Sequence, residues 1–248
     1  MAQIETRITD LGLNGKIIRL DVMRNIQDAV SNEIKRGAKT IIAVGNDITI
    51  NRVVNAILRT EINTGLGANL PLGIIPIGDK NNLIAPILGI TDAEDACDVL
   101  SARRVEKLDI GQANQNYFLS QASITSKNTT LEIDQNYSVE IIDPGLINIF
   151  NLPPAYAIPP TQKDFLKNNQ PFPGDGKLDL YINTKPKKSL IKSKPPPSTS
   201  YFSLDKLTII NNKEPITLDN SLKIQTPAQI SVLKNKLNII VGKDRGFV

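Results

Sequence analysis

The chain has 248 residues, a formal net charge of +4 and 40% hydrophobic residues, which is an ordinary composition for a globular protein. Histidine is absent, which excludes Ser-His and Cys-His catalysis, histidine-ligated metals and histidine proton shuttles. The charge is too mild to indicate nucleic-acid binding. Any chemistry must therefore depend on carboxylates, Lys, Arg or a metal held by oxygen atoms.

Three features of the sequence bear on the compartment. Cys97 is the single cysteine, so no intrachain disulfide can form and a reducing compartment is favoured. The first ten residues mix both charges without an apolar stretch, so we expect no signal peptide. The most apolar region, residues 70–90, is interrupted by four polar residues, so we expect no membrane span. Together these features predict a cytoplasmic protein.

The first elements are weakly patterned. Residues 4–19 alternate loosely between apolar and polar and contain the turn pair Asn14-Gly15, which predicts a strand or short hairpin ending at Ile17-Ile18. Asp21 then resembles the N-cap of a helix that has one apolar face and ends at Gly37.

The next stretch has a sharper pattern. Apolar, mostly β-branched residues at 40–44 lead into Gly45-Asn46-Asp47, and the apolar spacing then becomes helical from Ile50 to Leu58. This pattern predicts a strand, a tight polar loop and a helix. The first N–H groups of such a helix are unpaired and lie at the positive end of its dipole, which favours phosphate binding.

A second junction of the same kind follows. Residues 72–75 predict a buried strand, Gly78 a turn, and residues 83–88 an apolar helix; a third helix over residues 92–102 begins with a capping box of Thr91 and Glu94. Strands that alternate with helices predict a parallel sheet covered on both faces, with ligands at the carboxyl ends of the strands.

The pattern changes near residue 105, where helical periodicity is nearly lost and short alternating segments begin. These segments are residues 105–110, 117–124, 130–133, 138–142, 146–150, 177–182, 207–210, 216–218, 229–233 and 237–241. Prolines and Asn-rich turns separate them, as in an all-β sandwich. We therefore predict an α/β domain over residues 1–110 and an antiparallel β-sandwich domain over residues 111–248. The last strand is a candidate to return to the first domain.

Several segments together resemble one known family. Residues 41–57 (IIAVGNDITINRVVNAI) are similar to the nucleotide loop of the diacylglycerol kinase catalytic-domain family, Gly-Gly-Asp-Gly-Thr followed by a helix with Asn-Glu-Val-Val-Asn. Residues 72–90 resemble its Leu-Gly-Ile-Leu-Pro-Leu-Gly-Thr-Gly-Asn-Asp-Phe-Ala element. Further similar elements, in the family's order, are residues 105–111 with 116–119 (Ile-Asp-Leu-Gly and Tyr-Phe-Leu-Asn), 175–182 (Asp-Asp-Gly-Leu-Leu-Asp-Val) and 216–221 (Asp-Gly-Glu). The chain thus resembles a divergent lipid kinase of the bacterial or sphingosine kinase type.

The resemblance implies the NAD kinase/diacylglycerol kinase-like fold and an ATP-dependent transfer of the γ-phosphoryl group to the hydroxyl of diacylglycerol or a related lipid, with ATP and Mg²⁺ as cofactors. It assigns nucleotide binding to Gly45, Asn46, Asp47, Thr49, Gly78 and Asn82. It assigns the Mg²⁺ ion to Asp109 and the catalytic general base to Asp219. Phosphoryl transfer needs mainly positioning and charge neutralisation, which carboxylates with Mg²⁺ supply without histidine.

Some positions depart from the family pattern. Two loop glycines are replaced by Asn46 and Ile48; a β-branched Ile does not tolerate positive φ, and its side chain would crowd a triphosphate. The family's Glu after the loop is Arg52, and the Glu of Asp-Gly-Glu is Ser221. The family's first strand would precede Met1. If that strand is absent, a sheet edge is exposed, and either the start of the chain is truncated or the site has decayed.

One segment predicts a membrane partner. Residues 185–197 contain five lysines, Lys185, Lys187, Lys188, Lys192 and Lys194. Clustered lysines attract anionic lipid with about 1 kcal/mol each, which suits an enzyme that meets a lipid substrate at a membrane surface. The alternative interpretation of residues 185–197 is a loop exposed to solvent. The assembly state stays open, with a homodimer as one candidate.

Alternative interpretations remain at each level. Gly45 and Gly78 can be ordinary turn glycines, Asp109 a strand-end carboxylate that caps a turn, and Asp219 a hairpin residue. The whole chain can be a degenerate family member that binds a nucleotide or lipid without catalysis. It can also be an NAD kinase-like enzyme, because NAD kinases share the first loop, although the second loop and the Asp-Ile-Gly element speak against that function.

Overall fold

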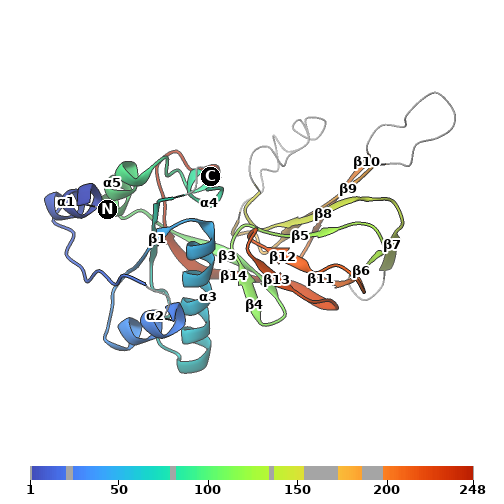
Figure 1. Ribbon diagram of the computed structural model, residues 1–248, viewed down its shortest axis with the longest axis horizontal. Coiled ribbons are helices and arrows are strands. Elements are labelled where there is room, and N and C mark those ends of the chain that lie inside the picture. Colours follow the sequence, from blue (N-terminus) through green and yellow to red (C-terminus); the bar gives the residue numbers. More distant parts are fainter. Residues whose placement is uncertain are drawn as a thin grey trace. The chain divides into compact units, whose positions relative to one another are not determined.

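The computed structural model describes residues 2–20, 25–78, 82–133, 137–153, 173–185 and 198–247 (Figure 1). They form two compact units. The first contains the described residues up to Leu108 and those from Asn235 on, and the second contains those from Asp109 to Lys234. Several residues singled out in the sequence lie outside the described ranges: Asp21, Lys187, Lys188, Lys192 and Lys194.

The first unit is built on parallel strands. β1 (Ile41–Gly45) pairs with β2 (Leu72–Pro76), and the end of β14 (Ala228–Ile240) pairs with β2 through Ile239 and Leu72. The helices are α1 (Ala2–Asp10), α2 (Ile26–Lys35), α3 (Asp47–Thr64), α4 (Ile84–Ile87) and α5 (Ala93–Ala102). α3 packs against β1 and α2, and α5 packs against β2 and α1 (Figure 1). This is the α/β arrangement that places loops at the carboxyl ends of parallel strands.

Glycines set two details of this unit. Gly73 lies in β2 beside α5, where an added Cβ would lie 2.3 Å from Leu100 Cδ2, so only a residue without a side chain lets the helix pack this closely. Gly65 ends α3 in the left-handed conformation, with φ of 70°, which glycine adopts at little cost.

The second unit contains two sheets. In one, β11 (Lys206–Ile210) lies between β6 (Thr129–Ile133) and the start of β14, β7 (Tyr137–Ile141) pairs with β6, and β3 (Val105–Ala113) pairs with β4 (Asn116–Phe118). The other has the order β10 (Ser198–Leu204), β9 (Leu178–Thr184), β8 (Gly145–Phe150), β5 (Gln121–Thr125), β12 (Ile216–Leu218) and β13 (Leu222–Ile224). All these pairs are antiparallel, and buried apolar side chains from both sheets form one core cluster, including Phe118, Leu131, Ile147, Leu180, Leu207 and Ile230.

The predicted fold class, a parallel α/β part followed by an antiparallel β part, is therefore confirmed. In detail, the two predicted strands at 229–233 and 237–241 are one strand, β14, and the segment 117–124 is two strands, β4 and β5. β10 and β13 were not predicted.

The prediction for the N-terminal segment is wrong. Residues 2–10 form helix α1 rather than a strand or hairpin, and neither Asn14 nor Gly15 has the positive φ that a tight hairpin turn requires. Ile4 and Ile8 are spaced for one helix face, and Arg7 bridges to Asp98 of α5 at 2.7 Å. Packing against α5 thus decides the conformation of a short segment whose own pattern is weak.

Two predicted helix caps are also wrong. α2 begins at Ile26, and its N-cap is Asn25, whose side chain accepts the Gln27 N–H, rather than Asp21. The N-cap of α5 is Asp92 rather than Thr91, because the Asp92 carboxylate accepts two backbone N–H groups of the first turn. The residues that form the cap hydrogen bonds therefore lie one to a few positions after the predicted caps.

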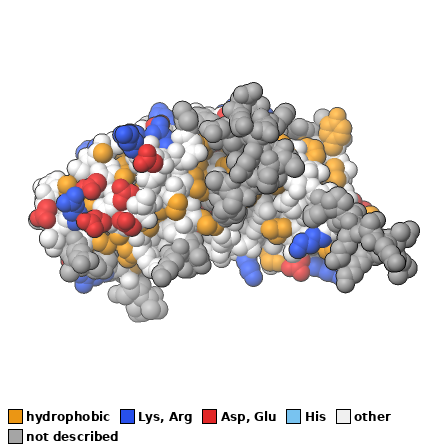
Figure 2. Space-filling view, turned by 90° about the horizontal axis from the view of Figure 1, so that it is seen from above, with side chains coloured by type: hydrophobic (Ala, Val, Ile, Leu, Met, Phe, Trp, Pro, Cys, Tyr) orange, Lys and Arg blue, Asp and Glu red, His pale blue; other side chains and the backbone are white. Residues whose placement is uncertain are grey.

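The surface carries mixed charge. Figure 2 shows acidic and basic side chains intermingled over the left-hand part of the visible face, where Figure 1 places α1 and α5. Neither sign dominates there, in keeping with the small net charge. Within the described ranges, no helix combines the length and the apolar character needed to cross a membrane.

Candidate nucleotide site

The structure brings two predicted loops together at one edge of the first unit's sheet. We call Gly45–Thr49 the first loop and the described residues 77, 78, 82 and 83 the second loop. β1 and β2 end in register, Gly45 opposite Pro76, and the Ile77 N–H donates to the Gly45 carbonyl oxygen at 3.1 Å. Because parallel strands place their carboxyl ends at one edge, both loops lie where α/β proteins bind ligands.

The first loop turns directly into α3. Asn46 has an extended conformation (φ −88°) and is the N-cap: its Oδ1 accepts the Thr49 N–H at 3.2 Å and the Thr49 hydroxyl at 3.2 Å. A Cβ on Gly45 would lie 2.7 Å from Thr49 Cβ, so this position has no room for a side chain. One amide cap and one steric requirement therefore determine the conformation of the first loop.

The departures from the family's glycines cause no backbone strain. Neither Asn46 nor Ile48 has a positive φ, and Ile48 lies in the first turn of α3 with its side chain 41% exposed. The expected conflict between a β-branched residue and a left-handed conformation does not arise. The expected crowding of a triphosphate remains a prediction, because an apolar side chain lies at the start of the helix.

Asp47 links the first loop to the second. Its Oδ2 accepts the Leu83 N–H at 2.8 Å and its Oδ1 accepts the Ile84 N–H at 3.4 Å. Asn82 Oδ1 accepts the Ala85 N–H at 3.0 Å, and among the described residues the buried Asn82 Nδ2 has no hydrogen-bond partner. Asp47 thus positions the start of α4 through charge-assisted hydrogen bonds. Gly78, with φ of 97°, supplies the turn before it.

Asp109 is fully buried in the second unit. Its Oδ2 accepts the Gly176 N–H at 2.6 Å, and its carbonyl oxygen accepts Asn151 Nδ2 at 2.9 Å. Through these hydrogen bonds Asp109 stabilises the structure of the second unit. Across the described ranges, no three His, Cys, Asp or Glu side chains lie close enough to hold a metal ion. The described side chains therefore do not form a ready-made Mg²⁺ site, and the role of Asp109 as a ligand stays a prediction.

Asp219 is 3% exposed and holds a bend of the chain. Its Oδ1 accepts the N–H groups of Ser120 and Gln121 at 2.8 and 2.9 Å, and its Oδ2 accepts the Leu119 N–H at 2.8 Å. Asp219 and Asn220 both have positive φ, as the tight hairpin between β12 and β13 requires. The hairpin interpretation fits these contacts, and the role of general base stays a prediction.

Sequence reasoning missed two buried polar groups. In α3, Asn55 Nδ2 donates to Asn51 Oδ1 at 3.1 Å, and both side chains are buried. In β9, Asp179 is 9% exposed and accepts the Tyr201 hydroxyl at 2.7 Å. Burial raises the pKa of Asp179 to about 6, although the hydrogen bond from Tyr201 lowers it. In the sequence, the signal for these buried groups was a polar residue inside an otherwise apolar segment.

Comparison with known proteins identifies the first unit's relatives. Residues 2–113 match the family model of the diacylglycerol kinase catalytic domain. A putative lipid kinase of Streptococcus pneumoniae is 34% identical over 117 residues, which are 46% of this chain and 33% of the relative. A diacylglycerol kinase of Staphylococcus haemolyticus is 37% identical over 91 residues, 36% of this chain and 26% of the relative. The chain therefore matches only a third or less of the length of these curated relatives.

Solved structures share the fold over nearly the whole chain. A diacylglycerol kinase from Bacillus anthracis superposes with a TM-score of 0.75 at 17% identity, covering 98% of this chain and 92% of that one. An NAD kinase from Archaeoglobus fulgidus in complex with ATP gives 0.57 at 15% identity, covering 98% and 90%. At such identities the likeness concerns the fold alone. The resemblance predicted from the motifs is confirmed: residues 2–113 of this chain are similar to the diacylglycerol kinase catalytic domain.

Proposed function

We propose that this chain binds ATP at the first and second loops and transfers its γ-phosphoryl group to the hydroxyl of diacylglycerol or a related lipid. The observation that carries the proposal is the coupling of two strand–loop–helix junctions at one sheet edge through the Asp47–Leu83 contact. The names of the relatives, lipid kinase and diacylglycerol kinase, support the substrate class.

The start of α3 supplies the binding chemistry in this proposal. α3 is 18 residues long, so its dipole and the first N–H groups favour an anion at its N-terminus. Asn46 accepts the Thr49 N–H, so the cap satisfies one backbone donor of the first turn. Gly45 lets the backbone itself approach the ligand. Phosphoryl transfer needs little else from a protein than such positioning and charge stabilisation.

No step of the proposed reaction is assigned to a metal held by the protein. Mg²⁺ in kinases is held by one or two carboxylates together with the phosphates of the nucleotide. Asp109 is one candidate carboxylate, and Asp219 is the candidate base. Both remain proposals from the family resemblance.

The test uses the purified full chain. Calorimetric titration with ATP measures binding, and transfer of label from [γ-³²P]ATP to dioleoylglycerol in mixed micelles measures activity. Gly45→Ala, which meets Thr49, is expected to weaken ATP binding at least about tenfold, or about 1.4 kcal/mol. Gly15→Ala is the matched control, because no atom lies within 4 Å of its added Cβ and its φ is not positive. A folded wild-type chain that binds no ATP would overturn the proposal.

A second candidate is a member that binds nucleotide or lipid without catalysis. It is favoured by the Asp219 carboxylate, whose two oxygens already accept three backbone N–H groups. ATP binding without phosphate transfer to lipid would select it. The NAD kinase-like function is tested in the same assay with NAD as the acceptor.

Membrane contact is proposed through Lys185, which is exposed, and the neighbouring lysines named above. Co-sedimentation with vesicles containing anionic lipid, compared with neutral vesicles, tests it. Salt should weaken the binding, since surface charges are screened within about 8–10 Å at physiological ionic strength. Gel filtration over a range of concentrations tests the proposed homodimer.

A further inference from the structure

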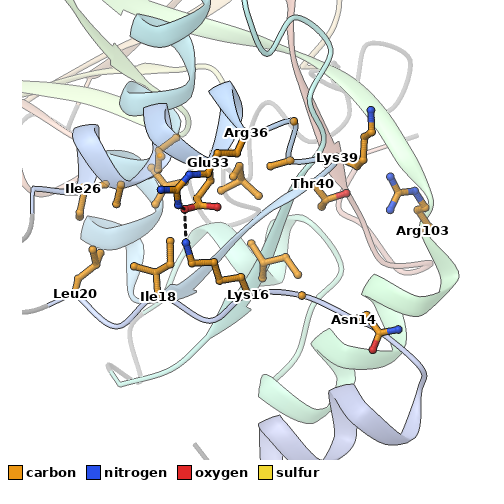
Figure 3. A pocket seen from close by; sticks show the side chains of 18 residues that line it. Asn14, Lys16, Ile18, Leu20, Ile26, Glu33, Arg36, Lys39, Thr40 and Arg103 are labelled. Carbon is orange, nitrogen blue, oxygen red and sulfur yellow. Dashed lines mark hydrogen bonds and ion pairs between the residues drawn. The ribbon is translucent and has the colours of Figure 1, made fainter.

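The first unit contains a pocket away from the two loops. It has a volume of about 610 Å³ and is lined by residues 14–20, α2 and the first residues of β1 (Figure 3). Thr40, Ile41 and Ile42 line it at the start of β1, whereas the first loop follows the end of that strand at Gly45. Its size lies within the range of about 300–1,000 Å³ found for small-molecule sites. The pocket is thus separate from the proposed nucleotide site.

Apolar residues make up half of the pocket's lining. The apolar lining residues are Ile18, Leu20, Ile26, Ala29, Val30, Ala38, Ile41, Ile42 and Val53. Leu20 is 41% and Ile42 39% exposed, so large apolar side chains face solvent here. β1 stands at the end of the strand order β1–β2–β14, and among the described strands β2 is its one partner. A hydrocarbon chain laid along this wall would remove apolar surface from water.

The charges of the pocket are unbalanced. Lys16, Arg36, Lys39 and Arg103 line it against one acid, Glu33. Glu33 Oε1 accepts from Lys16 Nζ at 2.6 Å and from Arg36 Nη1 at 2.8 Å, and the hydrogen bond from Lys16 lowers the pKa of Glu33. Within the described part of the chain, Lys39 and Arg103 have no acidic partner.

A polar atom without a hydrogen-bond partner lines the same pocket as these two cations. Thr40 Oγ1 is buried, lines the pocket and has no hydrogen-bond partner among the described residues. In Figure 3, Lys39, Thr40 and Arg103 lie on one side of the pocket, and Lys16, Glu33 and Arg36 lie together on another. A buried hydroxyl without a partner costs about 1–3 kcal/mol, which a bound acceptor would offset.

We infer that this pocket binds an amphipathic anion. The hydrocarbon part lies along the wall formed by α2 and the start of β1, and the anionic group lies between Lys39 and Arg103, where Thr40 donates a hydrogen bond to it. A fatty-acid carboxylate and a lipid phosphate share this chemistry. The inference does not depend on kinase activity, because none of the lining residues belongs to the two loops.

The test titrates the full chain with oleate, with 1-oleoyl lysophosphatidate and with oleyl alcohol, each below its critical micelle concentration. We expect the anions to bind at least about tenfold more tightly than the alcohol, which corresponds to 1.4 kcal/mol. Binding of one anion alone supports the inference and identifies its source, and binding of both shows that the negative charge is recognised. Equal binding of the alcohol would overturn it.

Variants locate the bound anion. Lys39→Ala with Arg103→Ala should weaken oleate or lysophosphatidate binding about tenfold. Lys35→Ala with Lys107→Ala, two exposed lysines that do not line the pocket, should leave binding unchanged. Thr40→Val, which keeps the shape, should weaken binding severalfold without lowering the melting temperature. ATP binding should be unchanged in all three variants, so failure of the proposed function is seen separately. Unaltered anion binding in the Lys39/Arg103 variant, or concentration-dependent dimerisation that blocks the pocket, would contradict the inference.

Discussion

The Asp47 carboxylate accepts the backbone N–H of Leu83 at 2.8 Å, across 36 residues of sequence. The contact ties the start of α3 to the start of α4, and the pairing of β1 with β2 places both at one sheet edge. An acidic residue in the first turn of α3 also interacts favourably with the dipole of that helix. One side chain therefore stabilises a helix start and positions the neighbouring loop.

Asp47→Asn should lower both stability and ATP affinity. The amide keeps one acceptor but loses the charge, so the free energy of unfolding should fall by about 1–2 kcal/mol. Urea denaturation measures the stability, and calorimetry measures the affinity. Asp28→Asn is the matched control, because Asp28 lies exposed in the first turn of α2. Equal losses in both variants would show that the link to Leu83 contributes nothing.

Ile48→Ala should raise ATP affinity severalfold if the side chain crowds the phosphates. Ala is preferable to Gly as the substitution, because Ile48 lies in a helix and Gly lowers helix stability by about 1 kcal/mol. Ile62→Ala, at a 55% exposed position of the same helix, controls for general effects on α3. An unchanged dissociation constant in Ile48→Ala would mean that this side chain does not restrict the nucleotide.

Local patterns predicted the junctions well because their signals are local. The apolar run before Gly45, the cap residue Asn46 and the helical spacing after it lie within about twenty residues. Contacts between distant residues could not be predicted in this way. The Asp219 carboxylate accepts the N–H groups of residues 119–121, about a hundred positions away. The spacing of residue types along the sequence does not show which backbone group a side chain contacts.

Weak patterns account for the remaining errors. β10 has the sequence STSYFSL and is largely exposed, so it lacks the apolar alternation that marks a half-buried strand. α1 has only nine residues, and an isolated helix of that length is marginal in water, so packing against α5 decides its conformation. Asp179 was missed because a single acid within a strand usually faces solvent.

Asp219→Asn should destabilise the second unit strongly. An amide offers one acceptor oxygen and turns its NH₂ group toward a backbone donor, so we expect a loss of about 2–3 kcal/mol. Asn220→Asp is the matched control in the same turn, because it keeps the acceptor used by Gln121 Nε2. If Asp219 is also the base, phosphate transfer is lost at temperatures where the variant is folded and still binds ATP. Full activity would exclude that role.

Tyr181→Phe should leave stability unchanged or raise it by up to about 1 kcal/mol, because the buried hydroxyl has no partner among the described residues. The ring contacts with Phe150 and Tyr201, at 5.7 and 5.1 Å between centroids, are kept. Tyr201→Phe is the contrasting variant, since it removes the donor to Asp179 and should lose about 1–2 kcal/mol. Equal losses would show that the Tyr181 hydroxyl is satisfied, for example by water.

Asp179 should make stability fall as the pH rises from about 4 to 6. Burial raises its pKa from 3.8 to about 6 in the folded protein. In this range the folded chain holds a proton that the unfolded chain has released, so the free energy of unfolding decreases with pH. The loss is complete above pH 6 and amounts to at most roughly 3 kcal/mol.

Asp179→Asn removes this dependence, because Asn carries no charge and its Oδ1 can still accept the Tyr201 hydroxyl. The variant should match the wild type near pH 4 and exceed it in stability at pH 7, as measured by urea denaturation at intermediate pH values. Asp205→Asn, which removes an exposed carboxylate of the same unit, is the control variant. A constant difference between wild type and Asp179→Asn from pH 4 to 7 would mean that Asp179 titrates alike in both states, as an acid open to solvent would.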